Sequence, residues 1–256
     1  MKGNVRPRDY NKYIWTWKEL FLVFGRCVGV VGILSYYFYR SPLAMVLLSF
    51  PGFLYFKFVE REKTDLYKEE LLVQFRECIL SVVTAMKAGY AVENAFMESR
   101  SDMRLLYGEE SAIYRELELF RRGLIINISL EELIRDLAAR SGTNEIEEFA
   151  EVFSIAKRNS GNITEIMESS ARLIGRRLET KQEILNLLGA KKTEWMIMKC
   201  VPFGMMTYLD LSNPGYFSQL YHNAMGVLVM TVCLILYLVA YLLGERMLRK
   251  ITEELV

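Results

Sequence analysis

Residues 224–243 read AMGVLVMTVCLILYLVAYLL, an apolar run without a charged side chain. A helix of about 20 such residues is long enough to cross the hydrocarbon core of a membrane, which is roughly 30 Å thick. Apolar stretches of comparable length occupy residues 20–39, 43–59 and 195–211. The chain is therefore expected to contain about four transmembrane helices.

The apolar stretches form two close pairs. Residues 40–42, Arg-Ser-Pro, separate the first pair, and residues 212–223 separate the second. Each pair is predicted to form a transmembrane hairpin, the first at 20–59 and the second at 195–243. The first stretch is longer than the apolar region of a signal peptide and lacks a small-x-small cleavage site, so we expect it to be retained.

The charges of the chain are unevenly distributed, although the formal net charge of all 256 residues is only +1. Residues 60–194 hold 20 Lys and Arg against 25 Asp and Glu, whereas the rest of the chain holds 12 against 6. The N-terminus, 1–19, is basic, and the tail, 244–256, is interpreted as a basic flank because it contains Arg246, Arg249 and Lys250. Because Lys and Arg accumulate on cytoplasmic loops, we expect both termini and residues 60–194 to be cytosolic. The weak overall charge argues against a nucleic acid partner.

The segment between the hairpins is predicted to be helical. Its apolar residues recur every three or four positions, as they do on one face of a helix, and no run alternates as a strand would. The predicted helices span residues 65–88, 91–106, 109–127, 130–140, 145–159 and 163–193. The last of them is expected to continue into the third apolar stretch as a strut.

Helix ends agree with these ranges. Glycines fall where the apolar stripes end, at Gly89, Gly108, Gly142 and Gly161. A capping oxygen precedes a glutamate by three residues at Ser129, Asn144 and Asn162. A helix, a glycine and a second helix also recur at a spacing of 72 residues, around Gly89 with Glu93 and around Gly161 with Glu165, which suggests two copies of a helical hairpin. The expected fold class is all-α: a polytopic membrane protein with about four transmembrane helices in two hairpins flanking a cytosolic six-helix bundle.

Residues that commonly carry out catalysis are absent from the predicted cytosolic segment. The only histidine, His222, lies in the predicted tip of the second hairpin, so no imidazole is available there as a base or metal ligand. No glycine-rich phosphate-binding motif occurs, and the four cysteines show no paired spacing. We therefore predict that the chain is not an enzyme and uses no cofactor and no metal.

Two charged helix faces are candidate partner contacts. The acidic face consists of Glu145, Glu147, Glu148 and Glu151. It is interpreted as a docking face for a basic partner, as a loose divalent-cation site, or as a solvated face with favourable charge at a helix N-terminus. The basic strip consists of Arg172, Arg176, Arg177 and Lys181. It serves either as a partner contact or in intrahelical pairs with Glu168, Glu179 and Glu183.

The third apolar stretch contains three candidate intramembrane functional residues: Lys199, Pro202 and Asp210. A proton or ion path requires such residues to face a cavity. The alternative is that Lys199 and Asp210, which lie close to opposite ends of the stretch, extend to the membrane interface, and that Pro202 kinks a packed helix.

Two segments resemble a known family. Residues 80–96, LSVVTAMKAGYAVENAF, resemble the helix, Ala-Gly-Tyr turn and helix that open the type II secretion system F-family domain, and residues 156–167, AKRNSGNITEIM, with ARLIGRR at 171–177, resemble its closing half. The resemblance implies an inner-membrane platform protein of a type IV pilus-like or secretion machine, without catalytic residues. A single helical domain preceded by two membrane stretches is most similar to the tight-adherence (Tad/Flp) pilus platform.

The resemblance also implies partners: a cytosolic motor ATPase, pilin subunits, membrane lipid, and a paralogous platform protein or a second copy of the chain. The candidate contact residues at its motifs are Gly89, Tyr90, Glu93 and Gly161. The alternative function is a small oligomeric transporter or channel, with the helical segment as a regulatory domain. A membrane-bound enzyme using clustered glutamates and a metal is least favoured, because no ligand set has recognisable spacing.

Overall fold

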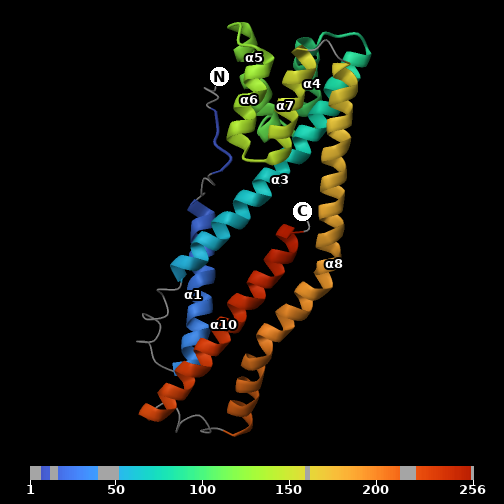
Figure 1. The fold of residues 1–256 in the computed structure, drawn as a ribbon. Helices are drawn as coiled ribbons and strands as arrows, with labels where there is room; N and C mark the ends of the chain where they lie inside the picture. Colours follow the sequence, from blue (N-terminus) through green and yellow to red (C-terminus); the bar gives the residue numbers. More distant parts are fainter. Residues whose placement is uncertain (1–6, 12–16, 40–51, 159–161, 214–222, 255–256) are drawn as a thin grey trace. The chain divides into compact units, whose positions relative to one another are not determined.

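The computed structural model describes residues 7–11, 17–39, 52–158, 162–213 and 223–254 (Figure 1). Every regular element within these ranges is an α-helix. The chain divides into two compact units: the first unit contains residues 1–14 and 60–179, and the second unit contains residues 15–59 and 180–256.

The helices are α1 (Trp17–Tyr39), α3 (Gly52–Lys87), α4 (Val92–Tyr107), α5 (Ala112–Ile125), α6 (Leu130–Ser141), α7 (Asn144–Arg158), α8 (Ile163–Ser212) and α10 (Ala224–Glu254). Helices α4 to α7 begin and end within three residues of the predicted ranges, whereas α3 begins 13 residues before the predicted residue 65 and α8 continues beyond residue 193. The all-helical prediction is confirmed for the described residues.

Glycine and capping side chains end and begin these helices as predicted. Gly89, Gly108 and Gly142 have φ values of +96°, +80° and +60°, a region that favours glycine because it has no Cβ. The Ser129 hydroxyl accepts a hydrogen bond from the Glu132 N–H at 3.2 Å and so caps α6.

Two details of the caps differ from the sequence prediction. Asn162 caps α8 as predicted, accepting from the Glu165 N–H at 3.3 Å, but Asn144 is the first residue of α7 rather than its cap. Ser111, which the sequence analysis did not single out, caps α5 by accepting from the Tyr114 N–H. Gly161 lies outside the described residues.

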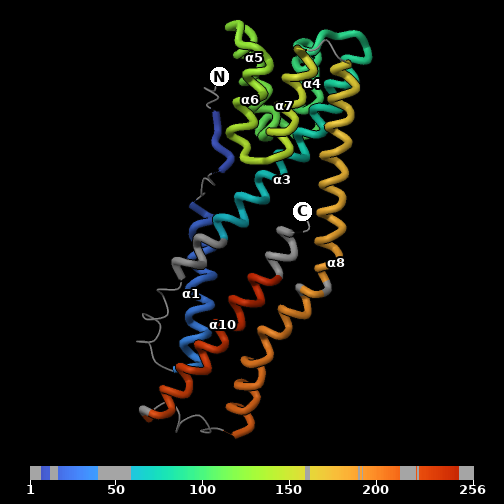
Figure 2. Tube along the Cα trace, in the orientation of Figure 1, coloured from blue at the N-terminus to red at the C-terminus, as the bar shows by residue number. Residues whose placement is uncertain are grey.

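Two helices, α3 and α8, extend beyond the first unit. Helix α8 is continuous for 50 residues and contains Pro202, so the expected continuation into the third apolar stretch is confirmed (Figure 2). Helix α3 runs for 36 residues from Gly52. Both helices therefore contribute residues to each of the two units.

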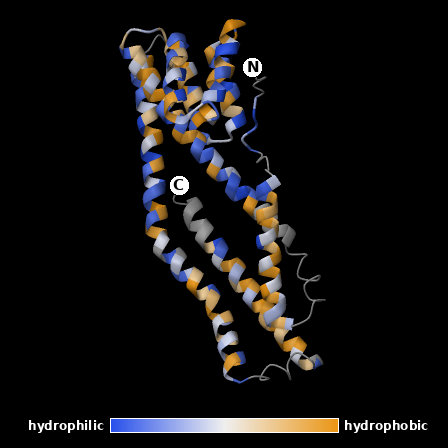
Figure 3. Ribbon diagram, turned by 180° about the vertical axis from the view of Figure 1, so that it is seen from behind, coloured by the Kyte–Doolittle hydropathy of each residue, from blue (hydrophilic) through white to orange (hydrophobic). Residues whose placement is uncertain are grey.

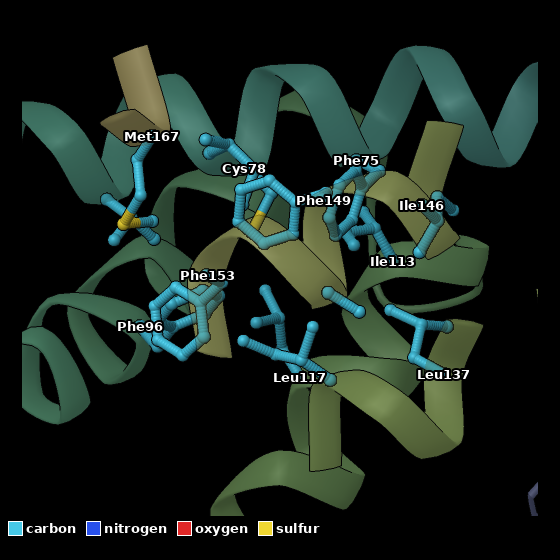
Figure 4. Packing of buried hydrophobic residues seen from close by; sticks show 14 of the residues in the cluster. Phe75, Cys78, Phe96, Ile113, Leu117, Leu137, Ile146, Phe149, Phe153 and Met167 are labelled. Atoms are coloured by element: carbon cyan, nitrogen blue, oxygen red, sulfur yellow. The ribbon is translucent and has the colours of Figure 1, made fainter. Parts of the chain in front are cut away.

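The first unit has one apolar core. Its buried side chains come from α3, α4, α5, α6, α7 and α8, and include the predicted apolar stripes. Phe75 of α3 packs edge to face against Phe149 of α7, with ring centroids 5.1 Å apart (Figure 4). Phe149 stacks on Phe153, with ring centroids 5.9 Å apart. Complete burial of such a side chain stabilises a fold by about 1.5–3 kcal/mol, so these contacts explain why the helices pack together.

A non-helical N-terminal segment also belongs to the first unit. Tyr10 is 1% exposed and stacks on Tyr67 of α3, with ring centroids 5.4 Å apart. The sequence analysis treated residues 1–19 only as a basic membrane flank, because a single tyrosine in a polar segment gives no periodic signal. Residues 8–11 are called the strap below.

The second unit contains the candidate membrane spans. Among the described residues, Trp17–Tyr39 of α1 and Met225–Met247 of α10 are long and apolar enough to cross a membrane (Figure 3). Of the other two predicted spans, residues 43–59 lie partly outside the described residues, and residues 195–211 lie within α8. That these two stretches span a membrane remains a prediction.

Contacts within the second unit are few and partly polar. Phe38 of α1 is buried against Met230 and Leu234 of α10. The Tyr37 and Tyr39 hydroxyls make hydrogen bonds of 2.7 and 2.9 Å to threonine hydroxyls of α8 and α10, at Thr207 and Thr231. Most other large apolar side chains of α1 and α10 are exposed, as expected of helices that face lipid.

Candidate functional site

The two motifs of the family resemblance lie together in the first unit. Lys157, near the end of α7, donates a hydrogen bond of 2.8 Å to Glu93 in the first turn of α4. Lys87, the last residue of α3, lies 2.7 Å from Glu168 of α8. Each pair joins the end of one predicted hairpin's first helix to the start of the other hairpin's second helix. We call Lys157–Glu93 and Lys87–Glu168 the crossed pairs.

The charges of the crossed pairs suit their positions in the helices. Lysines at helix C-termini and glutamates near N-termini both interact favourably with the helix dipole. Burial favours a raised pKa for Glu93, but the hydrogen bond from Lys157, a backbone hydrogen bond and the charge of Lys157 together outweigh it and lower that pKa. The hydrogen bond from Lys87 lowers the pKa of Glu168. Both glutamates are therefore held in their charged form near neutral pH.

The turn between α3 and α4 presents Tyr90 to solvent. The Gly89 N–H bonds to the Met86 carbonyl at 2.9 Å, and the Tyr90 N–H bonds to the Ala85 carbonyl at 3.2 Å. This is the Schellman arrangement, in which glycine takes the positive φ. Tyr90 is 51% exposed, so the turn displays an aromatic side chain beside the crossed pairs.

The acidic face does not behave as a single set. The guanidinium of Arg177 in α8 lies 3.1 Å from a carboxylate oxygen of Glu148 and 3.6 Å from one of Glu145. Both glutamates of α7 therefore form ion pairs with α8. Glu147 and Glu151 are exposed and have no ion pair within the described part of the chain. They lie four residues apart on α7 and leave negative charge available to a partner.

The basic strip is also divided by the structure. Arg172 pairs with Glu168 four residues earlier at 3.0 Å, as predicted for an intrahelical pair. Arg177 instead pairs across to α7. Arg176 is exposed and has no ion pair among the described residues.

The described residues contain no group of three or more His, Cys, Asp or Glu side chains placed to hold a metal ion. All four cysteines are free thiols. Burial raises the pKa of the Cys78 thiol to about 12, so this thiol is unreactive in the folded first unit.

The intramembrane candidates do not converge on one another. Lys199 forms a 3.0 Å ion pair with Glu245 of α10. Its ammonium also lies over the rings of Trp195 and Tyr241, at 5.3 and 4.5 Å from their centroids. Asp210 lies in the last turn of α8, roughly 16 Å further along the helix at 1.5 Å per residue, and Pro202 lies between them.

Two of the charged partners were missed by sequence reasoning. Glu116 is 1% exposed and pairs with Arg140 inside the first unit, and Glu245 pairs with Lys199. A signal for Glu116 exists in the sequence, because it shares a buried stripe with Ile113, Leu117 and Phe120 of α5. A carboxylate on an apolar helix face needs a partner. The identity of that partner depends on the packing of α5 against α6.

Comparisons with known proteins assign no family to the chain. Protein-family models, curated protein sequences and solved structures were all searched, and none matches. The resemblance of residues 80–96 and 156–177 to the F-family domain therefore remains a prediction.

Proposed function

We propose that the chain is a non-catalytic inner-membrane platform of a tight-adherence, type IV pilus-like machine or of a type II secretion machine. A cytosolic motor ATPase moves the helical domain, and the membrane helices hold or lift pilin subunits. In this proposal four transmembrane helices in two hairpins flank a cytosolic six-helix bundle, and both termini are cytosolic.

The observation that carries the proposal is the meeting of the two resemblance motifs. Their turn regions are about 70 residues apart in the chain, yet the crossed pairs link them directly. Two related helical hairpins packed around a common core account for this arrangement. The motifs therefore support the resemblance in space as well as in their order along the chain.

Helix α8 supports the mechanical part of the proposal. It contains Glu168 of the crossed pairs and continues to Ser212. Fifty residues of helix are about 75 Å long, and a helix transmits displacement along its axis better than a flexible linker does. A push applied to the first unit therefore reaches the third apolar stretch through a single element.

The motor contact is assigned to the acidic side of the first unit. Residues 60–194 carry a net charge of −5, from 20 basic and 25 acidic side chains. The exposed carboxylates of Glu147 and Glu151 and the ring of Tyr90 are available to a basic partner surface. Complementary charge of this kind speeds and orients association.

The contacts of Lys199 give little support to the alternative function, a transporter or channel. The Lys199 ammonium forms an ion pair with Glu245 and lies over two aromatic rings. These contacts link α8 to α10. A pathway residue needs access to its substrate. This contact fits a scaffold better.

The proposal is tested by deleting the gene in its host. Surface assembly or secretion is expected to be lost, while the purified motor keeps its ATPase activity. Normal assembly in the deletion strain contradicts the proposal.

A charge-reversal pair then tests the motor contact. Glu147→Lys with Glu151→Lys is expected to reduce assembly and motor binding without lowering the amount of the platform. The matched control, Glu179→Lys with Glu183→Lys, reverses two exposed glutamates at the same spacing on α8. Equal loss in both variants contradicts a specific contact on α7.

A further inference from the structure

The strap is held on the first unit by its main chain. The Tyr10 N–H donates to the Arg140 carbonyl at 3.0 Å, and the Arg140 guanidinium donates to the Arg8 carbonyl at 3.0 Å. Arg140 lies in the last turn of α6, where carbonyl groups have no partner within the helix. The Tyr10 N–H therefore satisfies a carbonyl at the end of α6, and the Arg8 carbonyl, two residues earlier in the strap, accepts from the side chain of the same arginine.

Side chains of the strap add a second set of contacts. The Tyr10 hydroxyl donates to Glu116 Oε1 at 2.7 Å, and its ring stacks on Tyr67. The Arg8 guanidinium lies 4.7 Å from the centroid of the Tyr67 ring. Lys68 Nζ donates to Asn11 Oδ1 at 2.7 Å. A tyrosine is thus recognised at both its ring and its hydroxyl.

The receiving groups also contact one another through hydrogen bonds that do not involve the strap. Arg140 donates to both carboxylate oxygens of Glu116, at 2.8 and 2.6 Å, and to Asp136 at 2.8 Å. All three residues belong to α5 and α6, and Glu116 is 1% exposed. Gly142, which ends α6 at a φ of +60°, lies beside the strap, close to the ends of the Asn11 and Lys68 side chains. Preorganised groups of this kind bind a ligand at low entropic cost.

We infer that α3, α5 and α6 form a binding site for a non-helical, tyrosine-containing peptide segment, and that the strap is its built-in, releasable ligand. In a bound segment, the main-chain carbonyl two residues before the tyrosine accepts from Arg140, as that of Arg8 does. A side-chain acceptor one residue after the tyrosine accepts from Lys68, as Asn11 does. This site is separate from the proposed function and from the crossed pairs.

Release of the strap needs only local opening. The strap has no helical hydrogen bonds of its own, and its contacts to the unit are confined to a few residues of α3, α5 and α6. Release exposes the buried ring of Tyr10, which belongs to the core cluster of the first unit, but it breaks no hydrogen bond within α3, α5 or α6. The covalent link keeps the strap at a high effective concentration, so an external peptide competes poorly until the strap is weakened.

The test measures binding of a fluorescent peptide to the full chain in detergent micelles. The peptide is residues 1–14, MKGNVRPRDYNKYI. The Tyr10→Ala chain is expected to bind it at least about tenfold more tightly than the unaltered chain, because the strap no longer competes. Tyr107→Ala, which removes an exposed tyrosine elsewhere on the first unit, is expected to leave peptide binding unchanged.

Altered peptides test the recognition itself. A peptide with Tyr10→Phe lacks the hydroxyl donor to Glu116 and is expected to bind about tenfold more weakly. Protection of the Cys78 thiol from labelling reports that the first unit is folded. If Tyr10→Ala loses this protection, the Tyr10→Phe chain replaces it, with an intermediate gain expected. No peptide binding to a folded, strap-weakened chain overturns the inference, as does equal binding of the Tyr and Phe peptides.

Discussion

Glu116 of α5 and Arg140 of α6 form a bidentate ion pair inside the first unit, with N···O distances of 2.6 and 2.8 Å. Burial disfavours the charge of Arg140, but the Glu116 and Asp136 carboxylates outweigh this and raise its pKa. A buried pair of this kind adds little net stability over apolar packing, yet losing one partner leaves an uncompensated charge. The pair therefore specifies how α5 meets α6.

Replacing Arg140 with Met is expected to destabilise the first unit by about 3 kcal/mol, because Glu116 is then buried without its partner. Stability is measured as the urea concentration at which Cys78 becomes reactive to a maleimide at neutral pH. The control is Arg104→Met, which breaks an exposed pair with Glu109 and is expected to cost less than about 1 kcal/mol. Equal effects of the two variants would show that burial does not matter here.

Gly89→Ala is expected to destabilise the first unit by about 1 kcal/mol, because an L side chain is strained at a φ of +96°. No atom lies within 4 Å of the added Cβ, so the cost is one of backbone conformation rather than of packing. Gly89→Asn is the matched control and is expected to cost less, since asparagine tolerates positive φ better than alanine does. The Cys78 labelling midpoint measures both, and a loss for Asn as large as for Ala contradicts this explanation.

The Lys157–Glu93 pair is expected to make stability depend on pH. The folded-state pKa of Glu93 is lowered, so its contribution is present above the unfolded pKa and disappears as the pH falls through the folded value. Between about pH 5 and pH 3 the unaltered chain should therefore lose more stability than Lys157→Met does, by about 0.5 kcal/mol for a partly exposed pair.

Urea unfolding followed by circular dichroism at each pH measures this difference. Lys191→Met serves as the control, because Lys191 pairs with Glu194 in the second unit. The same pH dependence in the Lys157→Met and unaltered chains contradicts a role for the pair.

Exchanging the charges of Lys199 and Glu245 separates a scaffold from a pathway. Lys199→Glu alone places two carboxylates together and is expected to lower the thermal stability of the second unit in detergent and to reduce assembly. The double variant Lys199→Glu with Glu245→Lys restores an ion pair and is expected to recover most of both. A double variant that regains stability but not function would instead favour a residue with a direct chemical role.

Much of the first unit was predictable because its signals are local. The apolar stripes that contain Phe75 and Ile146 recur every three or four residues and mark the helix faces that pack in the core. Gly142 ends α6 through its positive φ, and Ser129 begins that helix through a hydrogen bond from Glu132, three residues away. The strap could not be predicted in the same way, because Tyr67 and Glu116, which contact Tyr10, lie more than 50 positions away.

The candidate site was predictable in part. Gly89, Tyr90 and Glu93 were identified from their motif, and the structure places them at one exposed turn. The partners of the charged residues were not identified, since Lys157 lies 64 residues from Glu93. Charge alone does not select a partner, because any exposed lysine can pair with a glutamate. The packing of the helices decides which lysine lies within reach.

By itself the sequence determined the helical class, the helix boundaries in the first unit and the apolar character of α1 and α10, because periodicity, glycine, caps and hydropathy act over one or a few turns. Only the tertiary structure decided which charges meet: Glu93 with Lys157, Glu116 with Arg140 and Tyr10, and Lys199 with Glu245. Those contacts join residues distant in the chain. They depend on how helix faces pack, and packing is set by the whole core rather than by any one segment.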